Sequence, residues 1–233
     1  MLAVSVRNSI LWPLLLLLGG SGCAALIYEI VWLQLLQLVI GSSAVSLGLL
    51  LATYMGGLCL GSIALPRLVS WQRNPLRVYA CLELGIAAFG MITLFGLPAI
   101  GRLYLAGPTS GMLGLVARGA VAAACLLPPT VLMGASFPAV ARWVESTPKA
   151  VSWLGALYSA NIAGAVGGCL IAGFYLLRVY DMTAATYTAA AINAAVALAA
   201  FALGQTPRPV FGDEGSDPLS LRVHVAYVSA CFI

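Results

Sequence analysis

The sequence predicts an all-α, polytopic transmembrane helix bundle with six spans, followed by a truncated apolar segment at the C-terminus. Hydrophobic residues make up 62% of the 233 residues, charged residues make up only 8%, and the mean hydropathy is +1.03. A soluble domain carries about a quarter charged residues, so this chain could not cover its own surface in water. Its net charge of +4 comes from scattered basic residues, which argues against a nucleic-acid-binding module.

Six apolar segments are each long enough for a spanning helix, which needs about 20 residues. Glycines, prolines and charged residues separate them, and these residues favour turns or are costly in hydrocarbon. No segment alternates in hydrophobicity with a period of two, so we predict helices rather than membrane-spanning strands. The predicted spans are Leu11–Val39, Ser43–Leu65, Leu76–Leu97, Met112–Pro138, Val151–Leu177 and Met182–Leu203.

The composition changes after the sixth span. Residues 204–222 are rich in acids, prolines and glycines and are predicted to form a polar cytoplasmic linker. Residues 223–233 begin another apolar run, about half as long as a span requires. We therefore interpret residues 1–203 as a transmembrane domain that belongs to a longer protein or to a truncated product. The alternative is a short C-terminal tail that docks loosely.

Lysines and arginines are distributed unequally between the two ends of the predicted spans. One end carries Arg7, Arg67, Arg73, Arg77, Arg142, Lys149, Arg208 and Arg222, and the other carries Arg102, Arg118 and Arg178. The end richer in basic residues is expected to face the cytoplasm. This predicts a multi-pass protein of the cytoplasmic (inner) membrane, surrounded by the lipid bilayer, with its N-terminus and linker in the cytoplasm.

Small residues at helical spacing predict two helix contacts. Helices in lipid associate through close approach of their backbones, which small side chains permit. The second span contains Gly57 and Gly61 in GxxxG spacing. The fifth span carries a stripe of small residues at Ala156, Ala160, Gly164, Gly168 and Ala172. We expect the fifth helix to sit centrally and to pack within the chain; the alternative is a homodimer face or a docking face for another membrane subunit.

Two features are expected to weaken or interrupt backbone hydrogen bonding near the middle of the membrane. They are the glycine-rich residues 19–22 and the pair Pro128–Pro129. Broken helices at that depth line sites in transporters, whereas the alternative is a simple packing kink. The six cysteines occur one to a segment without CxxC spacing, so we interpret them as packing residues and predict no metal and no cofactor.

Ionisable side chains inside a span are costly and are interpreted first as paired or functional. Helix geometry places Glu29 and Arg118 at similar depths, which predicts a buried ion pair; alternatively each reaches the outer interface separately. Glu83 lies about two turns inside the third span from the cytoplasmic side. It forms either an interfacial ion pair with a basic residue or a cation or proton site, and without a partner its carboxyl group should be protonated.

Three uncharged polar residues are predicted near the middle of the bilayer. They are Thr53, Asn161 and Asn193, on the second, fifth and sixth spans. Buried asparagines need hydrogen-bond partners, so we expect these side chains to bond across helices and hold the bundle in register. They would form a binding site only if the bundle enclosed a cavity, which the sequence does not show.

Short motifs in five spans resemble, in order and spacing, those of one family. They are Ser21–Trp32 with its Tyr28-Glu29 pair, Tyr54–Ser62, Leu82–Gly85, Met133–Pro138 and Gly155–Asn161 with Gly164–Gly167. Together they resemble the membrane region of fused spermidine-synthase-like proteins over nearly all of residues 9–203. The resemblance implies a membrane region similar to a major-facilitator half, joined to a cytoplasmic polyamine aminopropyltransferase-like domain.

The sequence departs from that family because it contains no strand, glycine-rich loop and helix of a nucleotide-binding unit. We therefore assign no catalytic residue, and the resemblance implies aminopropyltransferase activity only if a downstream domain exists. The sequence predicts a membrane-embedded, non-catalytic part of a spermidine-synthase-like protein that anchors or assembles a larger complex. The alternatives are half of a transporter for a polyamine or another cation, and an accessory subunit of a larger membrane complex.

Overall fold

The computed structural model describes residues 2–40, 43–68, 74–105, 112–144 and 150–205, and the chain in these ranges is helical without strands. The elements are α1 (Leu2–Ile40), α2 (Ser43–Leu68), α3 (Pro75–Leu105), α4 (Met112–Val144), α5 (Ala150–Ile171), the π-helical turn η1 (Ala172–Leu176), α6 (Leu177–Val179) and α7 (Met182–Leu203). The predicted all-α bundle is confirmed. The predicted segment 223–233 and all but the first two residues of the predicted linker 204–222 lie outside the described residues.

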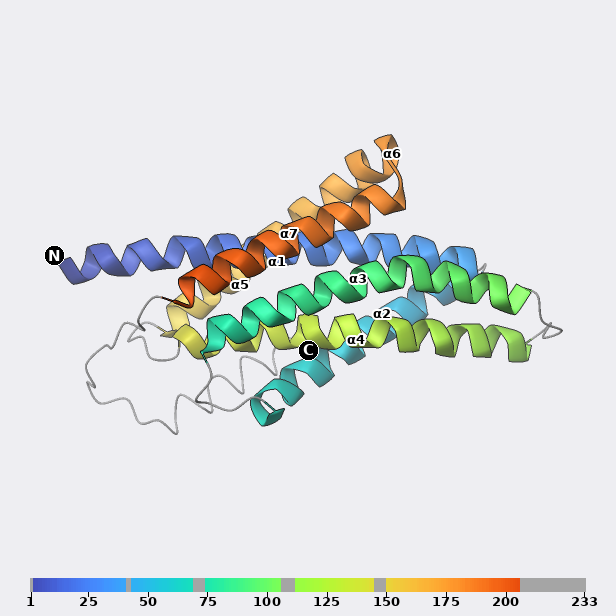
Figure 1. Ribbon diagram of the computed structural model, residues 1–233, viewed down its shortest axis with the longest axis horizontal. Coiled ribbons are helices and arrows are strands. Elements are labelled where there is room, and N and C mark those ends of the chain that lie inside the picture. The colour runs from blue at the N-terminus through green and yellow to red at the C-terminus, as the bar shows by residue number, and fades with distance from the viewer. Residues whose placement is uncertain (1, 41–42, 69–73, 106–111, 145–149, 206–233) are drawn as a thin grey trace.

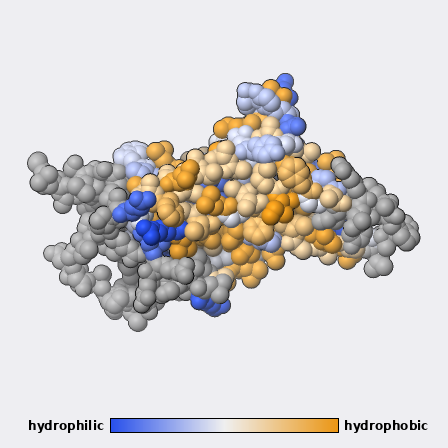
Figure 2. All heavy atoms as spheres, in the orientation of Figure 1, coloured by the Kyte–Doolittle hydropathy of each residue, from blue (hydrophilic) through white to orange (hydrophobic). Residues whose placement is uncertain are grey.

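Within the described residues, six helical segments are long and apolar enough to cross a membrane: Leu11–Ile40, Ala44–Ala64, Pro75–Ala99, Val116–Val144, Ser152–Val179 and Met182–Leu203. An apolar band covers the middle of the face shown in Figure 2, and the hydrophilic atoms gather toward its ends and at the tip near α6. Large apolar side chains are openly exposed, such as Leu16 at 75% and Leu198 at 71%. Contiguous exposure of this kind suits lipid rather than water. The chain is a multi-pass, membrane-embedded protein.

The interruptions expected in the first and fourth spans do not occur. α1 runs unbroken through residues 19–22, and α4 runs unbroken through Pro128 and Pro129. The departure from α-helical geometry lies instead in the fifth span, where η1 inserts a π-helical turn before α6. A turn of this kind accommodates one extra residue in a helix. The chain then reverses direction at Asp181, whose side chain accepts a hydrogen bond from the backbone nitrogen of Ala184 at 2.7 Å.

The central helix is α1 rather than the fifth span. It contacts α2, α3, α4, α5 and α7, whereas α5 packs mainly on α1. Figure 1 shows α1 running the length of the bundle, with α5 and α7 rising from it toward the tip at α6. Tyr28 and Trp32 of α1 are fully buried, and their rings stack with centroids 5.5 Å apart. The expectation that the fifth helix sits centrally is therefore wrong, because its small residues serve one close contact and not several.

Glycines create the two closest helix contacts, and both lie within the chain. Gly164 and Gly168 of α5 lie so close to α1 that an added Cβ atom would overlap main-chain atoms of α1. Gly57 and Gly61 of α2 lie equally close to α4. Among the other members of the predicted stripe, Ala172 is fully buried and Ala156 and Ala160 are half-buried. Two tight pairs, α1 with α5 and α2 with α4, therefore form the frame of the bundle.

Candidate functional site

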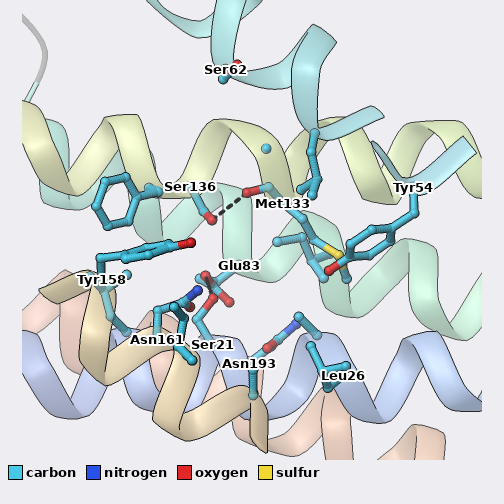
Figure 3. A pocket seen from close by; sticks show the side chains of 18 of the residues that line it. Ser21, Leu26, Tyr54, Ser62, Glu83, Met133, Ser136, Tyr158, Asn161 and Asn193 are labelled. Atoms are coloured by element: carbon cyan, nitrogen blue, oxygen red, sulfur yellow. Dashed lines mark hydrogen bonds between the residues drawn. The ribbon is translucent and has the colours of Figure 1, made fainter. Parts of the chain in front are cut away.

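A cavity of about 540 Å³ lies within the bundle, bounded by α1, α2, α3, α4, α5 and α7 (Figure 3). Its volume falls in the range of about 300–1,000 Å³ that is typical of small-molecule sites. Most lining side chains are apolar. The polar ones are Ser21, Tyr54, Ser62, Glu83, Ser136, Tyr158, Asn161 and Asn193. Within the described ranges the lining includes one acid, Glu83, and no lysine, arginine or histidine.

Glu83 lies in the interior of the bundle, where α3 faces α1. Its side chain is fully buried, and its Oε1 atom accepts a hydrogen bond of 2.7 Å from the hydroxyl group of Ser21. Its Oε2 atom has no hydrogen-bond partner among the described residues. The neighbouring Tyr79 hydroxyl group donates to the backbone oxygen of Leu17 at 3.3 Å. One carboxyl oxygen therefore has a serine donor, and the other is buried beside Tyr79 without a geometric hydrogen bond from the described residues.

Asn193 contributes a second buried acceptor from α7. Its side chain is 1% exposed, and its Oδ1 atom has no hydrogen-bond partner in the part of the chain that the structure describes. The bond across helices that was expected of this oxygen is therefore not formed. Asn161, on α5, lies against Gly22 of α1 and also lines the cavity. Two of the three predicted mid-membrane polar residues thus meet at a cavity together with Glu83.

Tyrosines stand on two sides of Glu83. Figure 3 shows Tyr54 and Tyr158 on opposite sides of the carboxyl group, with their hydroxyl groups directed inward. The ring of Tyr158 is held by an edge-to-face contact with Phe137, with centroids 6.1 Å apart. Ser136 is already occupied, because its hydroxyl group donates to the backbone oxygen of Met133 at 2.7 Å. The two tyrosines therefore direct polar groups toward the centre of the cavity.

The cavity is partly open, and the exposed side chains of its lining indicate an opening between α2 and α5. The exposed side chains of the lining are Met55 on α2 and Ile162, Val166 and Cys169 on α5. These two helices belong to different tight pairs, since α2 packs on α4 and α5 packs on α1. The entrance is therefore lateral and is flanked by apolar side chains.

The predicted pair Glu29 and Arg118 is not brought together as an ion pair in the described residues. Both side chains are half-buried, and the Nε atom of Arg118 is buried without a hydrogen-bond partner among them. The pairing stays a prediction with no contact to support it. Glu29 does not belong to the described lining of the cavity, which makes it a useful control for Glu83.

Thr53, the third predicted polar residue, lies away from the cavity. Its hydroxyl group donates to the backbone oxygen of Leu49 at 2.8 Å, and its own backbone oxygen accepts from Thr130 of α4 at 3.5 Å. It therefore belongs to the contact between α2 and α4. Glu83 also forms no ion pair with a basic residue in the described ranges, since the side chain that bonds it is Ser21. The sequence did not single out Ser21 as a site residue, although its hydroxyl group, within the glycine-rich residues 19–22, donates to Glu83.

Comparisons of the chain with protein-family models, with curated proteins and with solved structures found no match. The resemblance to spermidine-synthase-like proteins therefore stays a prediction from the motifs. Among the described residues no three potential metal ligands cluster, and the five described cysteines, Cys23, Cys59, Cys81, Cys125 and Cys169, are free. The site to be explained is thus a cavity with one buried carboxyl group.

Proposed function

We propose that this chain is one half of a membrane transporter that binds a cation in the cavity between its helices. The observation that carries the proposal is the Oε2 atom of Glu83, which is buried in the cavity wall without a donor from the described residues. Burying an ionised carboxylate without a partner is very costly, so the group must take up a proton or a cation. A cation in the cavity supplies the missing partner.

The arrangement of helices supports a transport role over a purely structural one. Ionisable groups in a span that face an internal cavity mark substrate or ion pathways. The cavity is formed by helices that are distant in sequence, and it opens between the two tight pairs. Relative movement of those pairs would change access to Glu83. Six helices provide one half of the site in transporters built from repeated halves.

Uptake into proteoliposomes tests this function with a matched control. We expect the wild-type chain to accumulate radiolabelled tyramine above protein-free liposomes. Glu83→Gln should lower the initial rate by at least about tenfold, because it removes the charge that pairs with the cation. Glu29→Gln, which neutralises a membrane-embedded acid outside the cavity lining, should leave the rate within about twofold.

Uptake that is equal in wild type and Glu83→Gln at matched protein levels would remove this carboxyl group from the function. The absence of both uptake and binding would favour a second proposal, which the order of the sequence motifs supports. In that proposal the chain is the non-catalytic membrane part of a spermidine-synthase-like protein, anchoring or assembling a larger complex. An accessory subunit of another membrane assembly would give the same negative result and would copurify with its partner in mild detergent.

We also propose that the tip between α5 and α7 faces away from the cytoplasm of an inner membrane, since basic residues favour the opposite end. Arg178, on α6, is exposed at this tip, and Gln205, just beyond α7, is exposed at the other end. A membrane-impermeant maleimide should label Arg178→Cys in intact cells and Gln205→Cys only after permeabilisation. The reverse pattern, measured against the parent chain with its native cysteines, would invert the orientation.

A further inference from the structure

We propose that the ligand of this cavity is an organic ammonium ion with a single positive charge and an apolar body, held by Oε2 of Glu83 and Oδ1 of Asn193. This inference rests on the proposed function and names its substrate class. Three properties of the cavity carry it: its hydrogen-bond inventory, its charge and the nature of its wall and entrance.

The unpaired polar atoms of the cavity wall favour a ligand that donates hydrogen bonds. The two buried atoms of the lining that lack partners among the described residues, Oε2 of Glu83 and Oδ1 of Asn193, are both acceptors. The hydroxyl groups of Ser62 and Ser136 already donate to backbone oxygens, at 2.9 and 2.7 Å. A primary ammonium group carries three N–H donors. A quaternary ammonium group carries none and would leave both acceptors unsatisfied.

The charge of the cavity matches one ammonium group and not two. Glu83 is the one acid in the described lining, and Glu29 lies outside it. A polyamine in this space would place its second ammonium group in an apolar environment without a counter-ion, which is costly. A bare metal ion is also a poor fit, because hard cations need about six or more oxygen ligands and no cluster of acidic ligands occurs among the described residues.

The wall and entrance suit a ligand that is mostly apolar. Leu26, Leu58, Ile86 and Met133 line the interior, and Figure 3 shows Leu26 and Met133 on two sides of the polar groups. The entrance between α2 and α5 is flanked by the exposed side chain of Val166 and its apolar neighbours. An alkyl or aryl amine partitions into a bilayer and can reach such an entrance from lipid. A polyamine stays in water.

A matched series of compounds that share a six-carbon chain tests the inference. Displacement of radiolabelled hexylamine is measured on the purified chain in lipid nanodiscs, with hexylamine, hexamethylenediamine, hexanol and hexyltrimethylammonium as competitors. We expect hexylamine to compete at concentrations at least about tenfold lower than the diamine and the alcohol, the difference that one buried charge-assisted hydrogen bond confers. It should also compete severalfold better than its trimethylated form.

Two variants test which side-chain atoms determine the selectivity among the four compounds. Glu83→Gln should remove the preference for hexylamine over hexanol, and Asn193→Leu should reduce the preference for hexylamine over its trimethylated form. Glu29→Gln should keep the wild-type order of all four compounds. Because the order of the competitors is also measured on the wild-type chain, the inference stays testable even if a variant fails to fold.

The outcomes separate this inference from the proposed function. If the diamine bound more tightly than hexylamine, or if the alcohol bound equally well, the ligand would not be an ammonium ion with a single charge. Uptake that depends on Glu83 would still support transport in that case. A trimethylated competitor that binds as well as hexylamine would overturn the role of Asn193. No specific binding of hexylamine together with no uptake of tyramine would overturn both proposals.

Discussion

Replacing Gly164 by valine is expected to separate α5 from α1 and to unfold the frame of the bundle. A Cβ atom at Gly164 would overlap the main chain of Gly19 on α1. Because backbone atoms cannot move aside as a flexible side chain can, the helices themselves must shift apart. We expect a loss of about 3 kcal/mol or more in the free energy of unfolding, measured by titration of the purified chain with sodium dodecyl sulfate in mixed micelles.

Gly167 provides the matched control on the same helix. A Cβ atom at Gly167 would meet no heavy atom within 4 Å among the described residues. Gly167→Val carries the same change in helix propensity and in hydrophobicity as Gly164→Val, so the difference between the two variants isolates the contact with α1. Equal stabilities would mean that α5 does not pack on α1 through this face, and they would also undermine the position of Asn161 beside the cavity.

The helices of this fold could be predicted from the sequence because a bilayer imposes a simple rule. Every backbone group must be satisfied within hydrocarbon, so long apolar segments become helices. The boundaries differ, since α3 and α4 continue past Leu97 and Pro138 to Leu105 and Val144. Hydropathy reports where side chains leave the hydrocarbon, whereas a helix ends where capping residues or a turn end it.

The arrangement of those helices was harder to predict because small residues identify close contacts without naming the partner. The stripe on the fifth span predicted a tight contact, and Gly164 and Gly168 make one with α1. The same stripe did not reveal that α1 is the central helix. The glycine-rich residues 19–22 of α1 form the other side of the contact with α5. Packing against α5 therefore explains why these glycines occur within an unbroken helix.

The sequence indicated individual residues of the candidate site but not that they lie together, for a related reason. Glu83 and Asn193 each stand out as polar groups within apolar spans. Their convergence depends on the relative rotation and depth of α3 and α7, which no local pattern encodes. The sequence predicted Arg118 as the partner of Glu29 and a basic residue as one possible partner of Glu83, whereas the structure gives Glu83 the hydroxyl group of Ser21. A serine is easily overlooked because it is equally common as a packing residue in membranes.

Replacing Glu83 by methionine should make the ligand-free chain more stable while abolishing cation binding. Methionine fills a similar volume without an unsatisfied oxygen, and a buried acceptor that lacks a donor destabilises by about 1–3 kcal/mol. The change releases the hydroxyl group of Ser21, which can donate to the backbone oxygen one turn earlier in α1. Glu83→Met should therefore unfold at a higher concentration of sodium dodecyl sulfate than wild type.

This result decides between a structural and a functional role for the carboxyl group. If Glu83 held the bundle together through Ser21, its loss would lower the free energy of unfolding, and Glu83→Gln, which keeps an acceptor for Ser21, would rescue it. If the carboxyl group of Glu83 serves to bind a ligand, Glu83→Met should be more stable than Glu83→Gln, and added hexylamine should stabilise only the wild type. A buried group that weakens the empty protein is expected where an occupied site needs it, and the comparison of Glu83→Met with Glu83→Gln measures that difference directly.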